Sequence, residues 1–215
     1  MNPIALPIIA WNRGLHLVRE RKRIAVLEDT IKAVRGGYER AKKNEMPHFQ
    51  RIHNAGLYVL LIEYDMAILK NDALFALRNW KKNFVARQFA VLLYEAADDL
   101  PELLGKEFRE SLKTLPLSDA EWACFNGIMK KINKFKQEHR GLLNELRNFV
   151  GAHRDQDAGK QLEIIEKVDL LKLMEISGQF YEAFRELMPF LARITLLLGD
   201  WKVILKHMPS KEFET

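Results

Sequence analysis

The sequence contains a single cysteine, Cys124, among its 215 residues. One cysteine excludes an internal disulfide framework and a zinc site built from several thiolates, and it fits a reducing compartment. We expect Cys124 itself to be a small, buried, apolar side chain. No segment reaches the roughly eighteen uncharged apolar residues that a membrane-spanning helix needs. We therefore expect a cytoplasmic protein with no membrane partner.

Signals for strands, nucleotide loops and metal sites are also scarce. There is no alternating strand pattern, and Gly36-Gly37 precedes no lysine and serine of the Walker type, so no cofactor is predicted. Glu45 and His48 have the Glu-x-x-His spacing of helical di-metal sites, which need two such motifs on unbroken helices. Only one copy is present, and Pro47 interrupts it. We expect no metal site.

Helical periodicity, in contrast, runs along almost the whole chain. Apolar residues recur every three or four positions in two long stripes, one after the capping-box sequence Ser118–Glu121 and one from Leu173 onward. Pro101 is placed where a helix start tolerates proline, and Pro189 should kink or divide the final helix. Helices are expected at about 14–43, 52–71, 75–99, 101–114, 118–150 and 173–205.

These helices predict an all-α fold, an up-and-down bundle of long antiparallel helices. The bundle is assigned to residues 51–215, and residues 1–50 to a basic helical extension packed on it. Residues 1–51 carry eleven Lys/Arg and five Asp/Glu, an excess of +6, whereas the whole chain carries +5. Such a basic segment attracts a polyanion such as RNA, with Arg21, Lys22 and Arg23 as candidate contacts. The alternative is an ordinary solvated helix face.

The most informative run lies between the two long stripes and contains Arg147, Asn148, Gly151, His153 and Arg154. Imidazole titrates near neutrality and can move a proton, and guanidinium groups match phosphate oxygens. The run therefore suits phosphodiester chemistry, provided that Gly151 lets His153 turn toward Arg147. The alternative is structural, with Arg147 capping the carboxyl end of its helix and His153 packing in the turn.

This run resembles the signature of the HEPN superfamily of helical-bundle domains, an arginine followed by a polar residue and, four to six residues later, a histidine. The resemblance implies a metal-independent endoribonuclease in which the RNA 2′-hydroxyl attacks the adjacent phosphate and leaves a 2′,3′-cyclic phosphate. By the same resemblance, His153 is the general acid or base, Arg147 stabilises the developing charge, and Asn148 orients one of them. Arg154 is a weaker RNA contact.

The resemblance also implies partners and further residues. Members are often homodimers whose two motifs face each other, and many act as toxins or antiviral effectors, so an antitoxin or nucleotidyltransferase partner is considered. Acidic residues often lie on an earlier helix, for which Glu95, Asp98 and Asp99 are alternatives. The rival hypothesis is a non-catalytic helical interaction module, either a degenerate HEPN domain or an unrelated bundle that binds protein partners.

Overall fold

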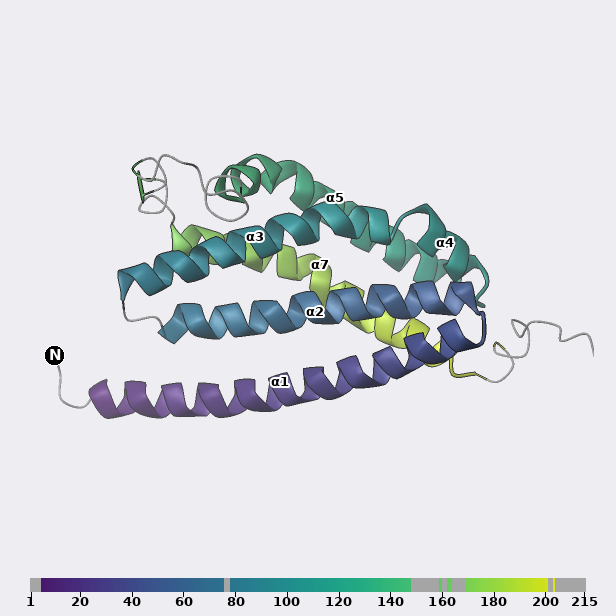
Figure 1. Cartoon of the computed structure of the whole chain (residues 1–215), viewed down its shortest axis with the longest axis horizontal. Coiled ribbons are helices and arrows are strands. Elements are labelled where there is room, and N and C mark those ends of the chain that lie inside the picture. The colour runs from purple at the N-terminus through teal and green to yellow at the C-terminus, as the bar shows by residue number, and fades with distance from the viewer. Residues whose placement is uncertain are drawn as a thin grey trace, which may run out of the picture.

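The computed structural model describes residues 5–75, 78–147, 159, 162–163, 169–200 and 203. Within these residues the chain folds into helices and no strand (Figure 1), which confirms the all-α prediction. The helices are α1 (Ala5–Lys43), α2 (Pro47–Phe75), α3 (Asn79–Leu103), α4 (Lys106–Lys113), α5 (Asp119–Arg147) and α7 (Leu170–Leu197).

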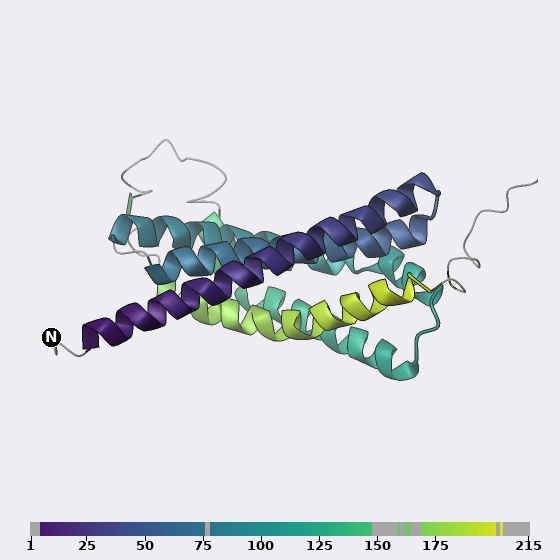
Figure 2. The same cartoon turned by 90° about the horizontal axis from the view of Figure 1, so that it is seen from below.

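The long helices alternate in direction along the chain, as an up-and-down bundle requires (Figure 1). α1 packs along α2, α2 packs on α3, α3 packs on α5, and α5 packs on α7, which also contacts α2 and α3. Seen from below, α1 crosses the outside of the bundle diagonally (Figure 2). α1 and α5 therefore lie on opposite sides of the layer that α2 and α3 form.

A chain of aromatic side chains fixes α5 against α7. Phe125 stacks on Phe190 with ring centroids 5.4 Å apart, and Phe135 packs on Phe180 at 5.0 Å. Phe125 and Phe180 are completely buried. Full burial of such a side chain contributes about 2 kcal/mol, and close aromatic pairs add somewhat more. The core therefore holds α5 firmly along its length and sets the position of its last turn.

Helix α5 begins at the predicted capping box. The backbone N–H of Ser118 donates to Glu121 Oε2 at 2.7 Å, and the N–H of Glu121 donates to Ser118 Oγ at 3.4 Å. The two side chains thus satisfy two backbone amides that the first turn of a helix leaves without partners. This detail of the sequence pattern is confirmed.

Two expectations about local structure are wrong. Pro101 does not start a helix but lies inside α3, because the Leu104 N–H still bonds to Leu100 O at 2.9 Å. The chain breaks instead at Gly105, where a Cβ would lie 2.8 Å from the carbonyl oxygen of Glu102. Cys124 is exposed, since the next residue, Phe125, takes the buried position on α5.

Pro189 lies inside α7, which continues to Leu197, so the proline does not divide this helix. The residues described contain one helix, α2, that is long and apolar enough to cross a membrane by composition, with 56% of its most apolar window buried inside the bundle. Such a helix also serves as an ordinary core helix, which is how α2 packs here. The predicted boundary between residues 50 and 51 falls near the start of α2 and stays a prediction.

Candidate functional site

Arg147 is the last residue of α5, and its side chain lies across α3. Its Nε–H donates to Glu95 Oε1 at 2.6 Å, and its guanidinium carbon lies 4.9 Å from the ring centroid of Tyr94. The Arg147 side chain is 33% exposed and that of Glu95 is 41% exposed. The pair is therefore held by a charge-assisted hydrogen bond and an aromatic face, and it remains open to solvent.

The seam between α3 and α5 continues with a second charged group, one turn along α3 and two to three turns back along α5. Asp98 lies 2.8 Å from Lys136 Nζ and 3.5 Å from Arg140 Nη2. The hydrogen bond from Lys136 chiefly lowers the pKa of Asp98, with smaller contributions from the charges of Lys136, Arg140 and Arg147. We call these residues the α3–α5 seam: Glu95 and Asp98 on α3, and Lys136, Arg140 and Arg147 on α5.

Asp99 points to a different helix. It accepts a hydrogen bond of 2.6 Å from the hydroxyl of Tyr58 on α2. Burial raises the pKa of Tyr58, and the hydrogen bond to Asp99 raises it further. Of the three acidic candidates on the earlier helix, Glu95 is therefore the one bonded to Arg147, Asp98 contributes charge nearby, and Asp99 belongs to a separate contact.

Three of the predicted site residues, Asn148, His153 and Arg154, lie outside the described residues. The structure therefore places one member of the predicted group, Arg147, and leaves its approach to His153 as a prediction. In the part of the chain that is described, Arg147 donates through Nε, and no hydrogen bond engages its terminal Nη atoms. These two atoms form the fork that binds phosphate oxygens side by side.

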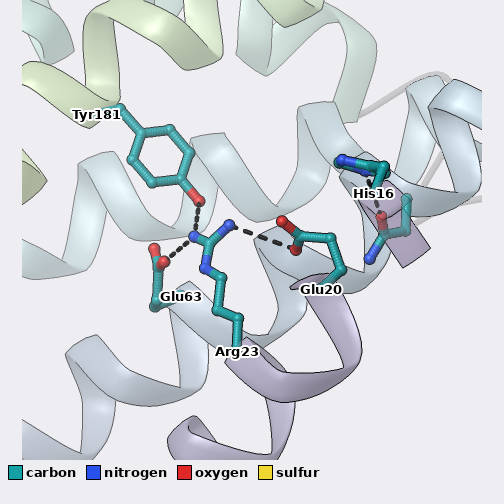
Figure 3. A network of polar contacts seen from close by, with 6 residues as sticks. His16, Glu20, Arg23, Glu63 and Tyr181 are labelled. Carbon is teal, nitrogen blue, oxygen red and sulfur yellow. Dashed lines mark hydrogen bonds and ion pairs between the residues drawn. The ribbon is translucent and has the colours of Figure 1, made fainter. Parts of the chain in front are cut away.

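The basic candidates on α1 divide into two kinds. Arg21 and Lys22 are exposed, whereas Arg23 turns toward the bundle (Figure 3). Arg23 bonds to Glu63 of α2, and it also lies 3.5 Å from the hydroxyl of Tyr181 on α7 and from Glu20 on its own helix. We call Arg23, Glu63 and Tyr181 the inner clamp.

Burial alone lowers the pKa of Arg23, but the hydrogen bond and charge of Glu63 outweigh it and raise that pKa above its ordinary value. Arg23 thus stays charged and tied to neighbours in the fold, and its expected RNA contact stays a prediction. Arg21 and Lys22 lie on α1, which packs along α2 and takes no part in the α3–α5 seam.

The seam residues Lys136 and Arg140 were not singled out from the sequence. A signal was available: Lys136, Arg140 and Arg147 are spaced four and seven residues apart, so they share one face of a helix. Glu95 and Asp98 have the matching spacing on α3. Two oppositely charged faces of this kind predict that the two helices are neighbours.

The arrangement is chemically suited to bind an anion. On the seam, three cationic side chains face two carboxylates, which leaves one positive charge beside a solvent-open guanidinium. Among the residues described, no group of three His, Cys, Asp or Glu side chains is arranged to hold a metal ion. His48, from the candidate metal motif, bonds instead to Ser111 Oγ at 3.2 Å.

In comparisons with known proteins, the chain matches no family model, no curated sequence and no solved structure.

Proposed function

We propose that this protein is a metal-independent endoribonuclease of the HEPN type, with Arg147 and His153 as catalytic residues and Asn148 orienting one of them. The observation that carries the proposal is Arg147 itself. It ends α5, is held by Glu95 and Tyr94, and lies at the start of the segment that contains His153. A guanidinium fixed at one edge and open at the other can support charge on a phosphate.

In the proposed reaction, the imidazole of His153 takes the proton of the RNA 2′-hydroxyl, and the 2′-oxygen then attacks the adjacent phosphorus. The bond from phosphorus to the 5′-oxygen breaks, and that oxygen leaves with a proton from a second imidazole, supplied by the other copy in a homodimer. Arg147 stabilises the extra negative charge on the non-bridging oxygens through its Nη atoms. The products are a 2′,3′-cyclic phosphate and a 5′-hydroxyl.

The test uses purified full-length protein and a labelled single-stranded RNA in buffer containing EDTA. The wild type should leave cyclic phosphate ends, and His153→Ala should slow cleavage by about a hundredfold, the usual size of a general acid–base contribution. His139→Ala is the matched control, since His139 lies on α5 outside the seam and bonds to Gln179 of α7. Equal cleavage by wild type and His153→Ala would overturn the catalytic assignment.

The second candidate is a non-catalytic helical interaction module, and one observation favours it. Trp80 and Phe84, one turn apart on α3, are 64% and 51% exposed, and Leu171 at the start of α7 is 78% exposed. Both helices begin at the same end of the bundle (Figure 1). Exposed apolar groups at one end of a bundle are typical of protein contacts.

Replacing Trp80 and Phe84 by serine distinguishes the two functions. If the protein cleaves RNA as a dimer through another face, the double variant keeps both cleavage and its sedimentation behaviour. If the exposed aromatic residues form the essential contact, the variant becomes monomeric while the wild type shows no nuclease activity. A cytoplasmic toxin or antiviral role, with an antitoxin or nucleotidyltransferase partner, belongs to the first proposal.

A further inference from the structure

A cavity of about 350 Å³ lies on the other side of the molecule from the α3–α5 seam, between α1, α2 and the end of α7. Its apolar wall includes Val34, Ala41, Phe49 and Leu198, and its polar lining includes Arg40, Asn44 and His53. This size lies within the range of small-molecule sites, which are mostly apolar with a few converging polar groups. None of these residues belongs to the proposed ribonuclease site.

His53 is the unusual member of the lining. The residue is 9% exposed, and its Nδ1 atom is buried without a hydrogen-bond partner among the residues described. Its ring lies directly on Gly37, where a Cβ would come within 2.4 Å of the imidazole Cε1. A buried polar atom without a hydrogen-bond partner lowers the stability of the fold by about 1–3 kcal/mol, so such atoms are normally paired in the working protein. A ligand in the cavity can supply the partner of Nδ1.

The charge of the cavity selects the ligand. Burial lowers the pKa of His53, and the nearby charge of Arg40 lowers it further, so the imidazole is neutral near pH 7 and offers one donor and one acceptor. Arg40 is the cationic side chain of the lining, and its guanidinium folds back along α1 toward Gly36. One cation beside neutral His53 and Asn44 matches a single negative charge better than a doubly charged phosphate.

A second hollow of about 280 Å³ adjoins this cavity between the same three helices. It shares Val34 and Thr195 with the first cavity, and the rest of its wall is almost wholly apolar, with Leu60, Met188 and Leu191. The two hollows are therefore neighbours, one with a polar lining and one almost wholly apolar, and we call the pair the groove. Such a groove fits a molecule with one charged head and one hydrocarbon tail.

We propose that this groove binds an amphipathic monocarboxylate, with its carboxylate at Arg40, Asn44 and His53 and its hydrocarbon chain past Val34 into the apolar hollow. The carboxylate accepts hydrogen bonds from the guanidinium and the amide, and from the imidazole N–H. Burial of the chain against Leu60, Met188 and Leu191 supplies the hydrophobic part of the affinity. The described residues that line the two hollows include neither Arg147 nor His153.

Isothermal titration of the full-length protein with octanoate tests this proposal, and the imidazole NMR signal of His53 reports where the probe binds. We expect one octanoate per chain and a change of the His53 signal. Arg40→Gln should weaken binding by about tenfold, because one charge-assisted hydrogen bond is lost. Arg40 is exposed, so this variant should keep its fold.

Arg35→Gln is the matched control, since Arg35 is an exposed arginine of α1 outside the cavity lining, and it should bind octanoate as the wild type does. Octanol, which lacks the charge, and inorganic phosphate, which lacks the tail, should both bind at least tenfold more weakly. Absence of octanoate binding at millimolar concentration, or equal binding to Arg40→Gln, would overturn the proposal. So would a His53 signal that changes with protein concentration instead of octanoate, because a second copy would then fill the groove.

Discussion

Two groups in this molecule each combine one arginine, one glutamate and one tyrosine, in different surroundings. Arg23, Glu63 and Tyr181 meet where α1, α2 and α7 pack together, and the Glu63 side chain is only 10% exposed. Arg147, Glu95 and Tyr94 meet at the α3–α5 seam, where the Glu95 side chain is 41% exposed. The two arginine side chains are about equally exposed, at 36% for Arg23 and 33% for Arg147, so the groups differ in the burial of the carboxylate and in the number of partners that each arginine has.

The number of its partners decides what each arginine is free to do. In the inner clamp, Arg23 has partners on three helices, so the group ties α1 to the bundle (Figure 3). At the seam, Arg147 bonds through Nε to Glu95, and among the residues described no hydrogen bond engages its terminal nitrogens. The comparison therefore supports the proposal that Arg23 serves stability and Arg147 serves the reaction, and the following variants test that division.

The largest effect on stability is expected from Arg23→Ala. Removing Arg23 leaves the Glu63 carboxylate nearly buried without its counter-charge, which should cost about 2 kcal/mol of unfolding free energy. Chemical denaturation measures this cost. The matched variant Arg147→Ala removes a solvent-open pair and should cost less than about 1 kcal/mol. Equal losses of unfolding free energy in the two variants would contradict the different structural roles given to Arg23 and Arg147.

A smaller effect is expected on the proposed activity from Glu95→Gln. Glu95 holds Arg147 through Nε and is treated as a positioning residue, so the change should slow RNA cleavage by about tenfold without altering the fold. Glu95→Asp, which keeps the charge but shortens the reach, should recover part of the loss. Asp99→Asn serves as the control, because Asp99 bonds to Tyr58 instead. A Glu95→Gln variant with unchanged cleavage would contradict the positioning role.

The smallest effect is expected from a third arginine–glutamate pair, which joins α5 to α7. Glu121 bonds to Arg193 and also forms the capping box with Ser118; the bond from Arg193, followed by those from Ser118, lowers the pKa of Glu121 to about 2. A carboxyl group whose pKa is lowered on folding stabilises the fold above its unfolded pKa of about 4.3. This stabilisation is lost as the pH falls toward 2.

Glu121→Gln should therefore destabilise the protein by about 1 kcal/mol at pH 7, and the difference from wild type should shrink as the pH is lowered from about 4 to 2. Denaturation at a series of pH values measures it. Glu186→Gln, which breaks the exposed pair with Lys131 at 2.5 Å, is the control with a smaller loss. A loss for Glu121→Gln that does not depend on pH would indicate packing instead of charge.

Much of the fold was predictable because helical periodicity and the Ser118–Glu121 capping box are local signals. Local signals also misled: Pro101 marks a helix start in the sequence, but the helical hydrogen bonds of α3 continue past it until Gly105. The general preference of cysteine for burial predicts a buried Cys124, yet Phe125 takes the inward position beside it and Cys124 is exposed. Such outcomes depend on which face of a helix the neighbouring helices cover.

The candidate site was predictable in part. Arg147 was singled out from its motif, but its contact with Glu95 is a pairing across 52 positions that depends on the antiparallel register of α3 and α5. The inner clamp was missed for the same reason, since Arg23, Glu63 and Tyr181 are distant in sequence and Arg23 looked like one more basic residue of α1. Long-range partners of this kind need the packing of the bundle to be known.

The most direct test of the division between the two groups is the RNA cleavage rate of Arg147→Ala beside that of Arg23→Ala, measured at a temperature where both variants are folded. We predict that Arg147→Ala loses at least about a hundredfold in rate, as removal of a group that stabilises transition-state charge does. Arg23→Ala should stay within about twofold of the wild type despite its lower stability. Cleavage by Arg147→Ala at the wild-type rate would contradict the account.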